Sequence, residues 1–585
     1  MFLTIIVLVC AAGVTGVFAG DRLPIMADLK KLSLEELMDI EVRTVFAASK
    51  HEQKVTEAPS SVTIVTSEEI KQYGHRTLAD ILKSVRGFFV TYDRNYAFLG
   101  VRGFGRPGDY NTRVLLMVDG HPINDNIYDT APIGTEFILD TDLIDRIEIS
   151  RGPGSSLYGS NAFFGVINIV TKSGRDLCGV EVSGGAGRFD SYRGRLSYGA
   201  AAAGGADALL SGTFYRSRGQ DLYFPEFDPA NPNADPAAAN NGVAAGADTD
   251  KSRSGFARAS YGDLTIEGGS VYRKKGIPTA SFKTLFNTRD TFTVDKHSYG
   301  ELKYGHAIDG RSGVSGRLAY DEYRYYGDYV SDRAVPPATP FIVTNHDDVA
   351  GKWWSGELMY SRETMPGNKI TFGAAFKDNI TQDQKNSDVE LAATYLDDRR
   401  SSFVWALYAQ DEAMFHDALI LNIGVRYDHY DTFGGTVNPR MSVIYLPAKK
   451  TAVKFLYGRA FRSPTTYELY YNDGGYTAKA NPDLKPETID TYEAVLEQYF
   501  GGGVRAAVSA YRYDIDNLIS FETDPADGLF QYRNENTIEA RGIELELEGK
   551  AAGGARGVLS AAFQRTRDRQ TGESLTNSPR VLSKL

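Results

Sequence analysis

The sequence predicts an antiparallel membrane β-barrel that is filled by a smaller N-terminal α/β domain. Helix and strand patterns mix up to about residue 175, whereas from about residue 178 onward segments of roughly ten alternating apolar and polar residues recur between turns. An apolar run at the start of the chain indicates export. A barrel this large would be an open pore unless something filled its lumen, and the compact α/β region is placed to do so.

Residues 1–19 are expected to form a signal peptide, because the apolar run FLTIIVLVCAAGVTGVFA ends in a small-x-small pattern before Gly20. No lysine or arginine precedes the run, so we expect the true start codon to lie upstream. No later apolar stretch of about 20 residues predicts a transmembrane helix. The exported chain would keep only Cys178, which can form no intrachain disulfide.

Residues 20–55 are predicted to be a periplasmic N-terminal segment. LKKLSLEELMDI at 29–40 favours a short helix, with Ser33 as its N-cap and Glu36 completing a capping box. EVRTVFAASK at 41–50 is strand-like and has no obvious partner strand nearby. We therefore expect a free strand there.

Residues 56–175 are predicted to form the α/β domain. SVTIVT, FFVTYD, LGVRGF, RVLLMVDG and IDRIEISRG have strand composition, and TSEEIKQYG favours a short helix. In RTLADILKSVRG, Thr77 is expected to cap a helix with Asp80 three residues on, and Gly87 to end it.

The stretch RGPGSSLYGSNAFFGVINIVTK at 151–172 is rich in glycine and serine before it becomes an apolar strand. A phosphate-binding P-loop needs Lys and Ser or Thr where Ser160 and Asn161 stand, and a dinucleotide site needs the glycines to open a helix. Nucleotide binding is therefore disfavoured.

Residues 176–585 carry the repeated alternation predicted for the barrel. In RGIELELEGK, Ile543, Leu545 and Leu547 share one face, and the glutamate that follows each of them lies on the other; ALILNIGVRYD alternates in the same way. A soluble β-sandwich would also alternate, but the pattern continues for roughly 400 residues, with Tyr and Phe at segment ends. The polar stretch 226–250 is interpreted as an extracellular loop.

Charge and residue types disfavour several classes of function. The net charge of −11 argues against a nucleic-acid partner, because neutralising phosphates requires a basic face. The sequence contains no Ser-His-Asp pattern with motif support, so no catalytic residue is expected. The eight histidines are scattered, so neither a metal site nor a cofactor is expected; His121 is interpreted as a turn residue.

Two sets of motifs together resemble TonB-dependent outer-membrane receptors. VRGFG at 101–105, LLMVDGHPIND at 115–125 and IDRIEISRGPGSSLYGSNAFFGVINIVTK at 144–172 resemble that family's plug domain. FRSPTTYELY at 461–470 and NPDLKPET at 481–488, followed by TYEAVLE, resemble its barrel motifs. The resemblance implies a bacterial outer-membrane receptor that actively imports a scarce nutrient, and a barrel of about 22 strands.

The resemblance also implies partners and site residues. Partners would be TonB with its inner-membrane energising complex, an extracellular metal-chelate ligand and outer-membrane lipid, and the plug glycines Gly152, Gly154 and Gly159 would make tight turns with positive φ. Two plug arginines, Arg102 and Arg151, would face two barrel glutamates, Glu493 and Glu544. The TonB box would be Glu41, Val42, Arg43, Thr44, Val45, Phe46 and Ala47, and plug-apex ligand contacts would be Arg94, Tyr96, Tyr110 and Tyr128.

The substrate and the completeness of the barrel stay open at this stage. A ferric siderophore is the first expected substrate, cobalamin is the second, and another chelate or an oligosaccharide is the third. The chain ends in NSPRVLSKL, which looks like the start of a further strand, so we expect the last barrel strands to be missing. A passive porin, an outer-membrane enzyme and a non-functional truncated receptor are the alternatives.

Overall fold

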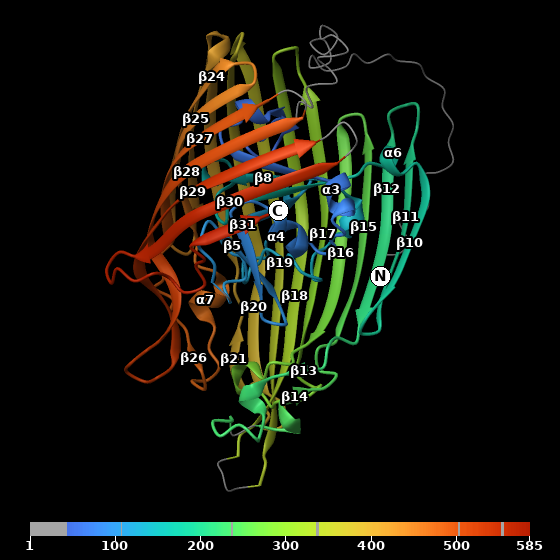
Figure 1. The fold of residues 1–585 in the computed structure, drawn as a ribbon, viewed down its shortest axis with the longest axis vertical. Helices are drawn as coiled ribbons and strands as arrows, with labels where there is room; N and C mark the ends of the chain where they lie inside the picture. The colour runs from blue at the N-terminus through green and yellow to red at the C-terminus, as the bar shows by residue number, and fades with distance from the viewer. Residues whose placement is uncertain (1–43, 107, 236–237, 335–338, 501–502, 551–554) are drawn as a thin grey trace.

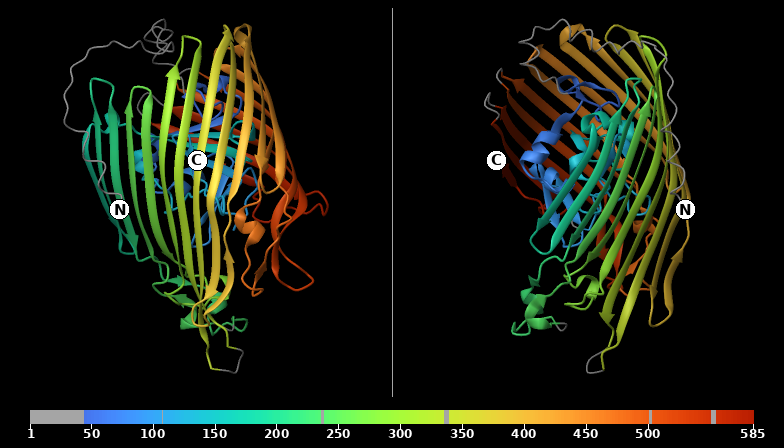
Figure 2. Two further views of the ribbon diagram at one scale, coloured as in Figure 1. Left: turned by 180° about the vertical axis from the view of Figure 1, so that it is seen from behind. Right: turned by 90° about the vertical axis from the view of Figure 1, so that its right-hand side faces the viewer.

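A 20-stranded sheet curves around a smaller α/β unit in the computed structural model (Figure 1). The structure describes residues 44–585 except 107, 236–237, 335–338, 501–502 and 551–554. The helix expected at 29–40, the signal peptide and the first three TonB-box residues lie outside the described residues. Both further views show the α/β unit inside the curve of the sheet (Figure 2).

The α/β unit, here called the plug, is built on a five-stranded sheet of order β3-β8-β9-β6-β7. These strands are β3 (Ser61–Thr66), β8 (Ile144–Arg151), β9 (Gly165–Thr171), β6 (Val114–Val118) and β7 (His121–Pro122). The pairing of β6 with β9 is parallel and the other pairings are antiparallel. A separate antiparallel pair is formed by β4 (Phe88–Tyr92) and β5 (Ala97–Val101). The strands predicted in this region are therefore confirmed.

Local capping residues position the plug helices. α3 (Ser67–Gln72) begins with a capping box of Thr66 and Glu69, and α4 (Leu78–Ser84) with the predicted box of Thr77 and Asp80. Among the described residues, the other α-helices are α5 (Ser155–Tyr158), α6 (Gly174–Leu177) and α7 (Thr466–Tyr470). In the part of the chain that the structure describes, no helix has the length and apolar character needed to cross a membrane.

The plug core is apolar and closed to solvent. Ile81 and Leu82 of α4 pack in one cluster with Leu116, Ile147 and Ile167 of the sheet, and each of these side chains is at most 1 % exposed. Burying each such side chain fully stabilises the fold by about 1.5–3 kcal/mol. The same cluster also contains buried apolar residues of the curved sheet, so this core packs the plug against the sheet around it.

The glycines of 151–172 have different roles. Gly152 and Gly159 have φ of +96° and +79°, in the left-handed region expected for them. Gly154 has φ −105°, so the prediction of a positive φ is wrong there. A Cβ at Gly154 would lie 2.8 Å from a methyl group of Val166, so close packing is the reason for this glycine.

The prediction of a free strand is wrong for the described part of 41–50. β1 (Thr44–Val45) pairs antiparallel with β2 (Gln53–Lys54), and Val45 is fully buried. The amides of Phe46 and Ala47 donate to Glu148 Oε2 at 3.0 Å each. The segment packs into the plug because its apolar residues reach a plug cluster and its amides meet a buried carboxylate.

The curved sheet begins at β10 and follows chain order to β31. Among the described residues no hydrogen-bonded pairing joins these two strands. Short β21 and β26 are side additions, since β20 pairs with β22 and β25 with β27 directly. The strands are β10 (Gly179–Gly187), β11 (Ser191–Ala201), β12 (Asp207–Ser217), β15 (Asp250–Tyr261), β16 (Leu264–Gly276), β17 (Phe292–Ala307), β18 (Ser312–Asp332), β19 (Ile342–Met365), β20 (Asn368–Asp388), β21 (Ala393–Asp398), β22 (Ser402–Phe415), β23 (Leu419–Tyr430), β24 (Gly434–Ala448), β25 (Thr451–Arg462), β26 (Ala478–Lys479), β27 (Glu487–Tyr499), β28 (Val504–Thr523), β29 (Phe530–Lys550), β30 (Arg556–Asp568) and β31 (Val581–Lys584).

The predicted alternation holds along the sheet. On β29, Ile543, Leu545 and Leu547 are 40–49 % exposed, while Glu544 is fully buried and Glu546 is 8 % exposed. Apolar side chains thus cover the outer face, and charged side chains face the plug.

Candidate functional site

Arg102 of the plug is enclosed by barrel side chains. Its guanidinium donates to Glu493 on β27 at 2.5 and 3.0 Å and to Glu544 on β29 at 3.2 Å. It also donates to the Tyr513 hydroxyl at 2.6 Å, and Arg102 and Glu544 are fully buried. Hydrogen bonds between a buried arginine and two carboxylates are directional, and removing one partner is costly because it leaves a buried charge unpaired. The structure thus brings together three of the four residues expected to join plug and barrel.

Arg151, the fourth residue, lies elsewhere. It donates to Thr63 Oγ1 at 2.5 Å and to Ser61, because Ser61 is its register partner across β3 and β8. Arg86 takes the expected place: its Nε lies 3.4 Å from Glu544 and its Nη1 lies 3.8 Å from Glu546. The prediction that Arg151 pairs directly with a barrel glutamate is wrong for this geometry.

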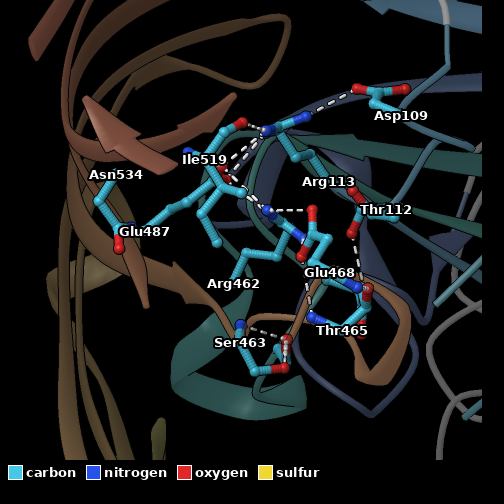
Figure 3. A network of polar contacts seen from close by, with 12 residues as sticks. Asp109, Thr112, Arg113, Arg462, Ser463, Thr465, Glu468, Glu487, Ile519 and Asn534 are labelled. Carbon is cyan, nitrogen blue, oxygen red and sulfur yellow. Dashed lines mark hydrogen bonds and ion pairs between the residues drawn. The ribbon is translucent and has the colours of Figure 1, made fainter. Parts of the chain in front are cut away.

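A second buried arginine network joins the plug to the barrel (Figure 3). Arg113 of the plug donates to Glu487 of β27 at 2.6 and 2.9 Å, and Arg462 of β25 donates to the same carboxylate at 2.9 and 3.0 Å. Arg462 also donates to Glu468 of α7, and Arg113 to Asp109. The FRSP and NPDLKPET motifs contain Arg462 and Glu487, so the sequence shows both residues, but the pairing between them was not predicted.

The N-terminal part of the plug is tied to the barrel by Lys50. Its ammonium donates to Glu357 on β19 and lies 4.7 Å from the ring centroids of Tyr158 and Tyr408. Burial lowers the pKa of the Lys50 ammonium to about 8, and the negative charge of Glu357 partly opposes this shift. Lys50 lies only three residues after the last residue of the expected TonB box.

Tyrosines line a cavity of about 540 Å³ between the plug apices and the long-loop end of the barrel. The plug residues Tyr96, Tyr110 and Tyr128 lie in its wall, with Tyr110 5.7 Å from Tyr96 and 5.6 Å from Tyr128 between ring centroids. Arg94, the fourth expected contact, lies outside this lining and beside Asp248 at 4.0 Å. Three of the four expected contacts therefore share one cavity.

The barrel supplies the other tyrosines of this wall, which the sequence analysis missed. They alternate along β18 and cluster on and after α7; Tyr128 lies 4.9 Å from Tyr467. The run YDEYRYYGDY was the pattern that could have shown them, because every second residue of a strand faces the lumen. The barrel tyrosines are Tyr323, Tyr325, Tyr329, Tyr467, Tyr471, Tyr476 and Tyr532.

A larger cavity of about 830 Å³ lies between the plug and the barrel wall. Its lining includes Asp263 in the short turn before β16 and Arg400 in the loop before β22, so it reaches toward both ends of the barrel. Phe46 and Lys50 also line it. A movement of the N-terminal segment would therefore change the width of this space.

His121 is a plug–barrel contact rather than the expected turn residue. It is fully buried, its Nε2 lies 3.0 Å from Asp321 Oδ1 on β18, and its ring stacks on Tyr299 at 4.3 Å. Within the described ranges, no group of three or more His, Cys, Asp or Glu converges on a possible metal position.

Comparisons with known proteins match both parts of the chain. The family model for the TonB-dependent receptor plug domain matches residues 54–166, and the model for the TonB dependent receptor-like β-barrel matches residues 213–585. The vitamin B12 transporter BtuB of Vibrio vulnificus is 25 % identical over 81 % of this chain and 70 % of its own length. The ferric enterobactin receptor of Pseudomonas aeruginosa is 22 % identical over 93 % of this chain and 80 % of its own length.

Solved structures agree on the fold. The ferric yersiniabactin uptake receptor FyuA of Yersinia pestis has a TM-score of 0.69 at 17 % identity, covering 92 % of this chain and 83 % of that one. The ferripyoverdine receptor of Pseudomonas aeruginosa also has a TM-score of 0.69, at 15 % identity, covering 92 % and 75 %. The plug, the curved sheet and the two family matches lead to one conclusion: the chain belongs to the TonB-dependent receptors of the bacterial outer membrane.

Proposed function

We propose that this receptor actively imports a scarce extracellular nutrient of the metal-chelate type, with a ferric siderophore ahead of cobalamin. The tyrosine-lined cavity carries the proposal, because it is built jointly by plug apices and barrel strands. Its volume of about 540 Å³ is within the usual range for small-molecule sites. Relatives named for vitamin B12 and for ferric enterobactin support this substrate type.

Tyr96, Tyr110 and Tyr128 are the proposed plug contacts. Their rings form a continuous series with Tyr467 of the barrel, so one ligand could touch both parts. Arg94 stays outside this proposal because it lies beside Asp248 and away from the cavity wall. A ligand bound by both parts would be sensitive to plug movement.

Residues 41–47 are the proposed TonB box, and TonB with its inner-membrane complex is the proposed source of energy. Because Val45 and Ala47 are buried, TonB would have to release this segment before pairing with it as an added strand. Release would pull on Lys50, which lines the larger cavity. That cavity is the proposed route for the ligand.

Uptake in a receptor-deletion strain tests the proposal. The strain is complemented with this chain, and uptake of radiolabelled ferric siderophores and cobalamin is measured with and without functional TonB. Rescue that disappears without TonB, or with Val42→Pro in the proposed box, supports active import. Uptake that persists without TonB would instead support a passive porin, and failure to reach the membrane would support a non-functional truncated receptor.

An enzymatic role is the remaining alternative, and the same preparation tests it. The family relatives named above are a transporter and a receptor. Conversion of a bound chelate by the pure protein, followed by mass spectrometry, would contradict a purely transporting role.

A further inference from the structure

The charge of the tyrosine-lined cavity narrows the class of ligand, provided that the proposed import function holds. The cavity wall contains ten tyrosines and five carboxylates, from Asp125, Glu136, Asp295, Asp347 and Asp473. Flat aromatic faces attract cations and pack against apolar rings. The carboxylates determine whether the cavity favours a cationic or an anionic ligand.

Several of these carboxylates are not neutralised by a cation. Asp347 accepts hydrogen bonds from Asn386 and from the Tyr471 hydroxyl, which are both neutral groups. Asp125 and Asp473 accept from backbone amides of their own loops. None of these three carboxylates forms an ion pair with a cation among the described residues.

Glu136 adds a buried charge at the same wall. It is 7 % exposed, and its Oε2 accepts no hydrogen bond among the described residues. The nearby cation, Arg273, lies 3.8 Å from Glu136 and is shared with Asp250 and Asp295. One guanidinium thus faces three carboxylates, which leaves this part of the wall negative.

The lining also contains two lysines and one arginine, which offset only part of the charge of its five carboxylates. Arg333 pairs with Asp388 at 2.9 Å, so its charge is already balanced. Lys296 lies over the rings of Tyr272 and Tyr326, which are not part of the lining. Lys283 is exposed and lies over Tyr476.

We propose that the cavity selects ligands without net negative charge, that is, uncharged or cationic molecules with apolar or ring faces. Polyanionic chelates such as ferric tris-catecholates would meet like charges in a partly desolvated wall, which costs binding energy. Cationic and neutral ligands gain from both the carboxylates and the tyrosine faces. The negative wall therefore disfavours the binding of anionic ligands.

Charge-selective thiol modification measures this property without knowledge of the natural ligand. Thr130, in the cavity wall, is changed to Cys in a chain that also carries Cys10→Ser and Cys178→Ser. The purified full chain in detergent micelles is then modified by two methanethiosulfonate reagents, one carrying trimethylammonium and the other carrying sulfonate. The exposed Cys178 of a chain with only Cys10→Ser provides the reference.

We expect the cation-to-anion rate ratio at position 130 to exceed that at Cys178 by at least about tenfold, the effect of about 1.4 kcal/mol. Adding Asp347→Asn should lower the ratio several-fold, whereas Asp309→Asn, in a distant exposed turn, should leave it unchanged. If Thr130→Cys does not fold, Ser331→Cys reports on the same cavity. A ratio equal to or below that at Cys178, or one insensitive to Asp347, would overturn the proposal.

The modification rates do not depend on transport. A chain that imports nothing would still report the charge of its cavity, so failure of the proposed import function appears only in the uptake assay. Conversely, a receptor that imports a polyanion while its cavity prefers the cationic reagent would contradict the ligand class and leave active import intact.

Discussion

Lys50 of the plug and Glu357 of the barrel form an ion pair that joins the first described segment of the chain to strand β19. Their side chains are 7 % and 18 % exposed, so water screens the pair only weakly. Lys50 lies two residues after Ala48, whose carbonyl accepts a hydrogen bond from Arg440 of β24, so a pull on the N-terminal segment would act on both contacts.

Removal of the Lys50 charge should loosen the N-terminal segment. We expect Lys50→Met to speed hydrogen exchange of the amides at 44–54 by about 10–100-fold, because Glu357 loses its partner and the hairpin opens more often. Hydrogen exchange with mass spectrometry measures this change. Lys54→Met, in an exposed pair with Glu57 of the same segment, should have little effect.

A charge swap checks that the effect comes from the pair itself. Lys50→Glu combined with Glu357→Lys should restore much of the protection, with a coupling free energy of about 1–3 kcal/mol in the double-mutant cycle. Independent effects of the two changes would show that the pair does not hold the segment.

Arg102 should be the costliest single plug residue to truncate among the plug–barrel contacts. Arg102→Ala leaves Glu493 without its guanidinium and leaves Arg86, at 3.4 Å, as the remaining ion-pair partner of Glu544, so we expect a loss of about 3–5 kcal/mol in plug stability. Denaturant-dependent protease cleavage within the plug measures this loss. Arg512→Ala breaks a pair with Asp514 in which the arginine is 52 % exposed, so it should cost at most about 1 kcal/mol.

A reversible cross-link can show whether the plug must move. The hydroxyls of Ser160 in the plug and Ser463 after β25 lie 3.1 Å apart, so cysteines at both positions, in a Cys178→Ser background, should form a disulfide. We expect the disulfide to abolish uptake and a reductant to restore it. Each single cysteine variant is the control, and full uptake by the oxidised double variant would argue against movement at this contact.

Asp129 in the plug apex region should make plug stability depend on pH. Burial raises the pKa of its carboxyl from 3.8 to about 6, against the charge of Lys377. The folded state therefore binds a proton more readily than the unfolded state, and the charged carboxylate destabilises the folded plug. This destabilisation is full above about pH 6 and disappears as the pH falls below about 4. Asp129→Asn should stabilise the plug by up to about 3 kcal/mol at neutral pH.

Plug unfolding measured across pH 4–8 checks this sign. The gain from Asp129→Asn should shrink steadily as the pH falls through about 6. Asp145→Asn, which also removes one carboxylate but at a side chain 44 % exposed, is the matched control. A gain that stayed constant across the range would contradict the assigned cause.

Features that depend on neighbouring residues were predictable from the sequence. The cap of α4 depends on Thr77 and Asp80, only three residues apart, and the alternation of β29 follows from the pleat of a strand. Arg102 and its two glutamates followed from the family resemblance. These features need no knowledge of how distant segments meet.

The missed features depend on pairings across long stretches of chain. Lys50 and Glu357 are 307 residues apart, and Arg113 and Glu487 are 374 apart. The register of β3 against β8 places Arg151 beside Ser61, so Arg86 reaches the glutamates instead. No local pattern contains that register, and so the prediction chose the wrong arginine.

The contacts that hold the plug also determine what happens when it lets go. Arg102, Arg113 and Lys50 meet the barrel through charged groups, and water solvates such groups well once they separate. Separation would therefore hydrate these charged groups, whereas the apolar contacts between plug and barrel, such as Phe164 with Tyr513, would expose apolar surface. Entry of water between plug and barrel would weaken these ion pairs, because water screens charges far more strongly than a dry interface does.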